Sequence, residues 1–174
     1  MKGPCRSTRV RWVWTCDGGS PKVSMQRLLH VNVVCTDLER SVDFYSRLLG
    51  GEVLSRVEKT DSPFMRAQGY GGQNAYRAAF IGFPKPEGGP VIDLLEWVDP
   101  PEGRRAPLDA KDLGIPRLAI GVKGVEALHE ALVDAGCDVL SAPLDLDVGP
   151  TRIRAFFVRD PDGALLELAE SRRG

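Results

Sequence analysis

The sequence has little histidine, no close cysteine pair and no long hydrophobic run. Two of its 174 residues are histidines, and its four cysteines are widely spaced without a CxxC motif. This spacing indicates the reduced thiols of a cytoplasmic protein and argues against a disulfide framework. With so few histidines, no Ser-His-Asp or Cys-His nucleophile set can be assembled. No segment approaches the roughly 18 apolar residues that a membrane-spanning helix needs.

Charge of neither sign dominates. Lys and Arg number 23 against 24 Asp and Glu, so the formal net charge is −1. This balance gives no reason to expect nucleic acid or a membrane as the partner. The contents of 43% apolar and 27% charged residues are ordinary for a soluble globular protein, and the length suits one domain with a proper core.

Residues 1–26 differ in character from the rest, because they are basic and contain only one acid, Asp17. The apolar run in this segment is interrupted by Arg11, which argues against a secretory signal. We expect either a disordered basic tail or a natural start at Met25. Residues 27–171 then form a single domain.

The segment Leu28–Gly51 predicts a strand followed by a helix. Leu28–Cys35 is apolar and β-branched, as in a buried strand, and Thr36 with Glu39 fits a capping box that starts the helix. Gly50 and Gly51 end that helix. Strands are expected at 52–57, 76–83 and 91–98, with a polar loop over 58–73. The order βαβββ defines a first module over 28–98.

A second module with the same order is predicted over 113–170, after a proline-rich linker at 99–112. Its expected elements are a strand at 115–122, a helix at 125–135 and strands at 137–140, 152–159 and 164–169. The last two strands are joined by the turn sequence at 160–163. The sequence GGEVLS at 50–55 recurs as GCDVLS at 136–141. The repeat indicates duplication of one βαβββ unit.

Alternation along the strands places polar residues on the face away from the helices. His30 and Asn32 lie out of phase with the apolar residues of the first strand, and Asp93, Arg117 and Glu167 do the same in three later strands. If the two sheets curl into one cup, these side chains converge inside it. A face open to solvent produces the same alternation, so the pattern alone leaves both interpretations open.

Three segments carry a family resemblance. They are LLHVNVVCTDLERSVDFYSRLLGGEV at 28–53, AFIGFPKPEGGPVIDLLEW at 79–97 and FFVRDPDGALLELAE at 156–170. Together they resemble the vicinal oxygen chelate superfamily, which includes glyoxalase I, bleomycin-resistance proteins and extradiol dioxygenases. The resemblance implies an α+β fold of two tandem βαβββ modules that form a curled mixed-sheet cup. It also implies a divalent metal held by the first and last strand of each module, which by position are His30, Asp93, Arg117 and Glu167.

Arg117 departs from this pattern, because the family usually supplies histidine there and a guanidinium has no lone pair for a metal. One interpretation is a protein that binds a small organic molecule in the cup without a full metal site, with Arg117 facing an acidic ligand and Asn32 beside it. The alternative is a lyase, isomerase or dioxygenase that depends on Zn, Mn, Fe or Ni. His30, Asp93 and Glu167 would then be the ligands, and Glu167 would double as general base. Either an intramolecular cup or a homodimer is compatible with two modules on one chain.

Overall fold

The computed structural model describes residues 27–69, 75–83, 89–99, 111 and 114–171. The predicted tail at 1–26 lies outside these residues, as does nearly all of the predicted linker. In the first module the elements are β1 (His30–Cys35), α1 (Leu38–Asp43), the π-helical turn η1 (Phe44–Leu48), β2 (Glu52–Thr60), α2 (Pro63–Ala67), β3 (Ala75–Gly82) and β4 (Val91–Asp99). In the second they are β5 (Leu118–Gly121), α3 (Val125–Asp134), β6 (Leu144–Val148), β7 (Thr151–Arg159) and β8 (Leu165–Ser171).

Each module forms one four-stranded mixed sheet, and the two sheets have the same topology. The strand orders are β1-β4-β3-β2 and β5-β8-β7-β6. In each sheet the first strand runs parallel to the last one, and the remaining pairs are antiparallel. The predicted α+β fold of two tandem βαβββ modules is therefore confirmed.

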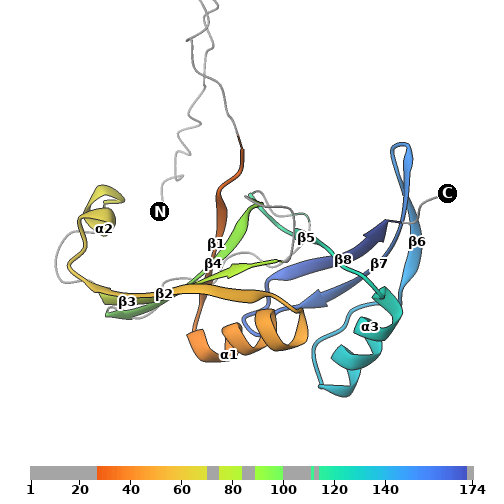
Figure 1. Cartoon of the computed structure of the whole chain (residues 1–174), viewed down its shortest axis with the longest axis horizontal. Coiled ribbons are helices and arrows are strands. Elements are labelled where there is room, and N and C mark those ends of the chain that lie inside the picture. Colours follow the sequence, from red (N-terminus) through yellow and green to blue (C-terminus); the bar gives the residue numbers. More distant parts are fainter. Residues whose placement is uncertain (1–26, 70–74, 84–88, 100–110, 112–113, 172–174) are drawn as a thin grey trace, which may run out of the picture.

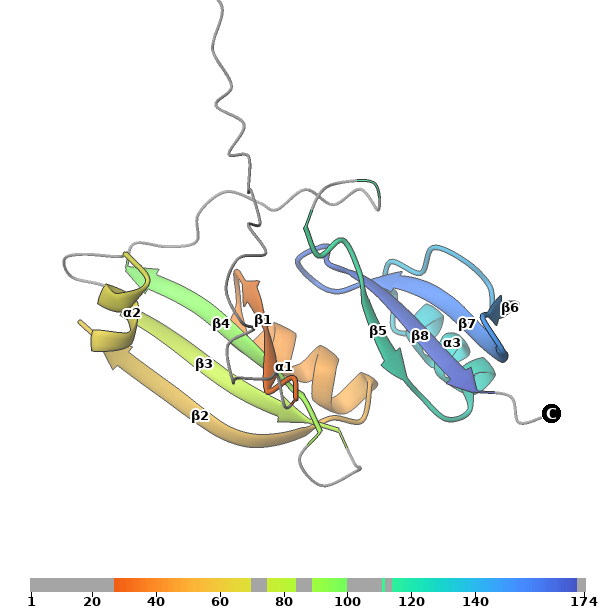
Figure 2. The same cartoon turned by 90° about the horizontal axis from the view of Figure 1, so that it is seen from above.

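The sheets lie side by side with β1 and β5 at their facing edges, and α1 and α3 lie under the same side of the molecule (Figures 1 and 2). The opposite face of both sheets carries no long helix among the described residues. No described helix is long and apolar enough to cross a membrane.

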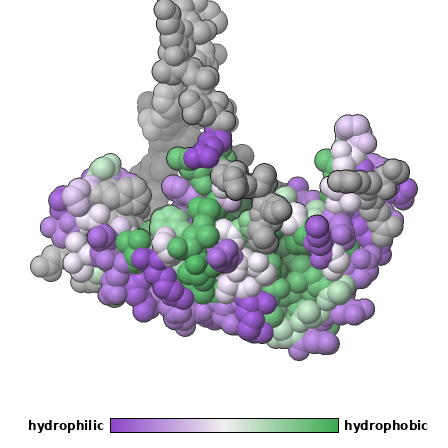
Figure 3. All heavy atoms as spheres, in the orientation of Figure 1, coloured by the Kyte–Doolittle hydropathy of each residue, from purple (hydrophilic) through white to green (hydrophobic). Residues whose placement is uncertain are grey.

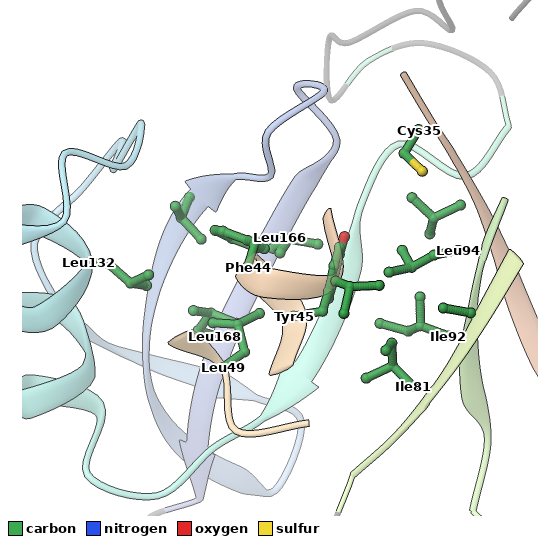
Figure 4. Close-up of a cluster of buried hydrophobic side chains, with 14 of the residues drawn as sticks. Cys35, Phe44, Tyr45, Leu49, Ile81, Ile92, Leu94, Leu132, Leu166 and Leu168 are labelled. Atoms are coloured by element: carbon green, nitrogen blue, oxygen red, sulfur yellow. The ribbon is translucent and has the colours of Figure 1, made fainter. Parts of the chain in front are cut away.

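One hydrophobic core spans both modules on the helix side. Phe44 and Tyr45 of η1 belong to the same buried cluster as Leu94 of β4 and as Leu166 and Leu168 of β8 (Figure 4). The helical segment of module one therefore packs against residues of both sheets. Burial of this shared apolar surface holds the modules together, at roughly 25 cal/mol per Å² removed from water.

A turn of module two reinforces this junction with hydrogen bonds. Asp160 is 5% exposed and accepts a hydrogen bond from the Tyr45 hydroxyl at 3.0 Å. Asp162 accepts hydrogen bonds from the backbone N–H and hydroxyl of Thr36 and from the guanidinium of Arg40. The predicted turn is thus also the contact between the modules.

The start of α1 differs from the prediction. Asp37, not Thr36, is the N-cap, and its side chain accepts from the backbone N–H of Arg40 at 3.0 Å. The capping box was wrong because the hydroxyl of Thr36 donates to Asp162 of the other module, at 2.5 Å. Glu39 likewise turns away from the helix start and pairs with Arg56.

Glutamates in the last strand of each module complete the helix caps. Glu96 of β4 accepts a hydrogen bond from the backbone N–H of Leu38, the first residue of α1. Glu170 of β8 does the same for Gly124 and Val125 at the start of α3. These carboxylates bind free N–H groups at the positive ends of the helices. The duplication therefore extends to how each helix is fixed to its sheet.

The strand predicted at 137–140 is also wrong. Only Val139 forms an isolated bridge there, to Val158. The second strand of this module in chain order is β6, which was not predicted because aspartate is uncommon in strands. Asp145 of β6 pairs with Arg152 and Arg154 of β7, so this acid is stabilised by cations on the neighbouring strand.

The loop predicted over 58–73 is shorter than expected. β2 continues to Thr60, and α2 follows at Pro63–Ala67. Residues 70–73 of the predicted loop lie outside the described residues.

Candidate functional site

Two acids occupy equivalent positions on the face away from the helices. Asp93 lies between two helix-facing apolar residues of β4, and Glu167 lies between Leu166 and Leu168 of β8. Each is only 8% exposed. Burial of a carboxylate is costly unless it has partners, so these side chains are not ordinary solvated residues. The interpretation of this face as a simple solvent-exposed surface therefore does not hold at Asp93 and Glu167.

In module one, Asp93 lies among His30, Asn32 and Phe80. β1 and β4 pair so that Asn32 is opposite Asp93, and the Asn32 amide donates to the main-chain oxygen of Asp93 at 3.1 Å. Phe80 is opposite Asp93 on the other side. The ring of His30 meets Phe80 edge to face, with centroids 6.4 Å apart. The parallel β1–β4 pairing thus groups the predicted residues of this module.

The carboxyl group of Asp93 has an unsatisfied atom. Its Oδ1 is buried and has no hydrogen-bond partner among the described residues. Burial raises the pKa of Asp93, while Asn32 and His30 oppose that shift. A buried acceptor without a donor is costly, which is a common sign that a ligand or ion supplies the missing contact.

An apolar cluster lies beside Asp93 on the same face of the sheet. Leu95 is two residues along β4 and so points to the same side. The cluster is separate from the main core and consists of Tyr76, Ala78 and Leu95, with Val57 and Trp97 packed against them. We call this group of residues the half-site of module one. It combines the carboxyl group of Asp93, the imidazole of His30, the amide of Asn32 and the neighbouring apolar cluster.

In module two, Arg117 pairs with Glu167. The Nε of Arg117 lies 3.0 Å from Oε2 of Glu167. The guanidinium carbon lies 5.7 Å from the centre of the Phe157 ring, a cation–π contact. In register, Glu167 lies between Ala119 of β5 and Phe157 of β7. The arginine therefore stretches across the face of the sheet from β5 to β7.

The predicted residues fall into two pairs rather than one group. His30 lies near Asp93, and Arg117 binds Glu167, but within the described residues no hydrogen bond or ion pair joins the two pairs. No three His, Cys, Asp or Glu side chains of that part of the chain lie close enough together to hold a metal. The predicted ligands His30, Asp93 and Glu167 are thus not assembled around one point.

Two aromatic residues of the site were missed. Phe80 and Phe157 are the register partners of Asp93 and Glu167. Counting outward from the tight turn at Asp160 would have paired Phe157 with Glu167, because a short hairpin fixes its own register. Phe80 carried no such signal, since residues 84–88 between β3 and β4 leave the length of that turn open.

Two βαβββ modules with polar residues on their first and last strands define the class of protein. Residues 27–168 match the family described as the glyoxalase/bleomycin resistance protein/dioxygenase superfamily, and the chain belongs to this family. A probable lactoylglutathione lyase of Vibrio cholerae is 29% identical over 154 residues, which cover 87% of this chain and 95% of that protein. A probable lactoylglutathione lyase of Synechocystis is 30% identical over 147 residues, covering 83% and 95%.

Solved structures agree with this assignment. A glyoxalase family protein from Bacillus cereus has a TM-score of 0.73 at 21% identity, covering 87% of this chain and 98% of that one, which supports the fold. Glyoxalase I of Leishmania major has a TM-score of 0.58 at 25% identity and covers 84% and 87%.

Proposed function

We propose that the protein binds a small organic molecule on the face of its two sheets that lies away from the helices. The observation that carries this proposal is the burial of Asp93 and Glu167 at equivalent positions of that face. Buried acids on a face that carries no long helix among the described residues are typical of a binding site, because a solvated surface does not exclude water from its charged groups. Asn32, His30 and Arg117 supply further polar contacts.

The residues of module two do not fit a metal ion. A guanidinium has five N–H donors and no lone pair, so Arg117 cannot be a ligand. Its Nε also forms an ion pair with Oε2 of Glu167 at 3.0 Å, so this carboxylate already has a cationic partner. A cation at this point would meet the positive charge of Arg117 at close range. We therefore favour a site in which the Arg117–Glu167 ion pair stands where relatives of the superfamily hold a metal.

The two half-sites can form one cavity if modules from two chains pair. Leu28 and Leu29 before β1 and Ile115 before β5 are exposed apolar residues close to the facing edges of the sheets. Hydrophobic residues gather in the middle of the molecule in the space-filling view (Figure 3). A homodimer would cover such surface and bring His30 and Asp93 of one protomer to Arg117 and Glu167 of its partner.

Protein-observed NMR with a library of small metabolites, including S-lactoylglutathione, tests the binding proposal. We expect binders to perturb resonances of Phe80 and Phe157 and to lose affinity in Asp93→Ala and Glu167→Ala. Asp134→Ala, an exposed acid at the end of α3, is the matched control and should leave binding unchanged. Binders that map only to the helix side would overturn the proposal.

Mixing two variants tests the pairing of modules. Asp93→Ala and Glu167→Ala each destroy one half of every site, whereas a mixed dimer of the two regains one intact site. Random pairing makes half of the dimers mixed, each with one intact site of two, so recovery of about a quarter of the natural binding capacity on mixing and refolding supports a shared site. No recovery, together with a monomeric mass in solution, would place both halves of the site within one chain.

A second candidate is a divalent-metal-dependent lyase, isomerase or dioxygenase. The unsatisfied Oδ1 of Asp93 beside His30 favours it, as do relatives named lactoylglutathione lyase. His30, Asp93 and Glu167 would be the ligands, and Glu167 would be the general base. Elemental analysis of protein purified without chelators, combined with an assay of S-lactoylglutathione turnover, separates the candidates. We expect less than one ion per chain; one tightly held Zn, Mn, Fe or Ni ion that is lost in Glu167→Ala would establish the second candidate.

A further inference from the structure

We propose that the Arg117 guanidinium is a receptor for the carboxylate group of the bound molecule, so that the ligand is a small organic acid. This inference rests on the proposed function and narrows it to one chemical class. In this inference Arg117 binds an anionic group of the ligand. Its role is then more than to form an ion pair with Glu167 at a position where relatives hold a metal.

Among the described residues, the side chain of Arg117 is held by two contacts, and these leave most of its N–H donors without an acceptor. Glu167 engages Nε at 3.0 Å, and the ring of Phe157 lies under the guanidinium at 5.7 Å. The side chain is nonetheless 47% exposed, whereas that of Glu167 is 11% exposed. No other acceptor among the described residues binds this guanidinium. A planar fork fixed at its inner edge therefore presents its outer N–H groups to the open face of the sheet.

The guanidinium of Arg117 matches a carboxylate in geometry, and its fixed position lowers the entropy cost of binding. Two parallel N–H···O bonds bind a carboxylate bidentately, and the arginine is already ordered, so little side-chain entropy is lost on binding. Ala119, beside Glu167 in register, is small and exposed and leaves the approach to the fork open. Phe157 supplies an apolar contact for the carbon skeleton next to the acid group.

The neighbouring charges favour a carboxylate over a phosphate. Glu167 already places one negative charge beside the guanidinium, and a dianion would be repelled more strongly than a monoanion. Within the described part of the module, the arginines on β7 are each paired with an aspartate or glutamate of the same module. Arg152, for instance, lies on a different face of the sheet and pairs with Asp145.

Paired probes test the inference on the full-length protein. Lactate, phenylpyruvate and benzoate are each compared with the corresponding primary amide, and phenyl phosphate is the rival anion. We expect at least one acid to bind at the Phe157 face about tenfold or more tighter than its amide, which is the size of one charged hydrogen bond. Arg117→Gln should abolish the preference for the acid. Arg117→Lys should retain only part of it, since lysine keeps the charge but not the fork.

The controls separate this inference from the proposed function. Arg152→Gln, an exposed arginine of the same module, should leave the acid preference intact. If acids and amides bind equally at this face, or if Arg117→Gln changes the affinity for neither, Arg117 is not a carboxylate receptor. The proposal that this face binds a small molecule would still hold. If phenyl phosphate binds tighter than every acid, the ligand class is wrong. If no probe binds at this face, the inference and the binding proposal both fail.

Discussion

The hydroxyl of Tyr45 donates a hydrogen bond to Oδ2 of Asp160 at 3.0 Å, between two side chains that come from different modules and are both buried. Oδ1 of the same carboxylate accepts the backbone N–H groups of Asp162 and Ala164 and so shapes the β7–β8 turn. One aspartate thus fixes a local turn and joins it to the helical segment of the other module. The packing of the modules and the geometry of this hairpin are therefore coupled.

Tyr45→Phe should lower the free energy of unfolding by about 1–3 kcal/mol, because Oδ2 of Asp160 is then buried without a donor. Urea unfolding followed by circular dichroism measures the change. In an Asp160→Ala background the same Tyr45 substitution should cost much less, since the acceptor is already gone. Equal costs in both backgrounds would mean that the hydrogen bond contributes nothing of its own.

Asp160 should also make stability depend on pH. Burial raises its pKa, although the hydrogen bonds from Ala164, Tyr45 and Asp162 oppose the shift. An acid with a raised folded-state pKa stabilises the fold fully below its unfolded pKa and loses that contribution as pH rises through the folded value. The stability of the natural protein relative to Asp160→Asn should therefore be greatest at acid pH and decline toward neutrality.

Urea unfolding at several pH values measures this difference. Asp43→Asn is the control of opposite sign, because the hydrogen bond from Arg47 lowers the pKa of Asp43. A lowered carboxyl pKa gives stability that is present above the unfolded pKa and lost on acidification. If Asp160→Asn and the natural protein show parallel pH profiles, the carboxyl group of Asp160 does not titrate differently in the two states.

Asp162→Ala should weaken the contact between modules. It removes acceptors from Thr36 and Arg40, and its side chain is only 13% exposed, so we expect a loss of about 1–3 kcal/mol in the free energy of unfolding. The matched control is Asp43→Ala, which breaks an equally short arginine pair on an exposed helix surface. That control should cost much less near neutral pH, because an exposed ion pair contributes little to stability. Similar costs for both would show that Asp162 acts only as a surface ion pair.

Gly51→Ala should be more costly than Gly50→Ala. A Cβ at position 51 would lie 2.5 Å from a methyl group of Ile81 and 2.7 Å from the carbonyl oxygen of Tyr45. Such overpacking against backbone costs typically about 1–3 kcal/mol or more. Gly50 has φ of 75° but open space around it, so its cost is only that of a left-handed alanine, roughly 1–2 kcal/mol. Thermal unfolding of the two variants gives the comparison.

The fold was largely predictable because its signals are local. Alternation placed Asp93 and Glu167 on the correct face, and the repeat GGEVLS/GCDVLS identified two modules. The errors arose from distant partners. Thr36 fitted a cap, but its hydroxyl binds Asp162, which lies 126 positions away in the sequence. β6 was missed because aspartate is uncommon in strands, and the arginines that pair with Asp145 lie on another strand.

The candidate site was predictable in its residues but not in its assembly. Strand phase and family resemblance named His30, Asp93, Arg117 and Glu167, yet neither specifies how one sheet lies relative to the other. That relation depends on the packing of Tyr45 and Phe44 against both sheets, a matter of side-chain shape. The contact of Arg117 with Phe157 could not be predicted for a related reason. Predicting it requires knowledge of the register among three neighbouring strands, β5, β8 and β7.

Arg117→His should create or strengthen a metal site. The substitution removes the cation, frees the carboxylate of Glu167 and places an imidazole at the position of the missing ligand. Isothermal titration with Zn²⁺ and Ni²⁺ should show binding at least about tenfold tighter than in the natural protein, because even outer-shell changes alter metal affinity by about 10–100-fold. The gain should disappear in the double variant Arg117→His, Glu167→Ala.

Arg152→His is the control for this change, because it adds an exposed histidine to the same module away from the site. It should produce no comparable gain. A tight site in Arg117→His that also requires His30 and Asp93 would mean that the two half-sites come together in solution. Binding that depends on Glu167 but not on Asp93 would mean that module two binds the ion alone and that the half-sites stay apart, as the single chain shows them.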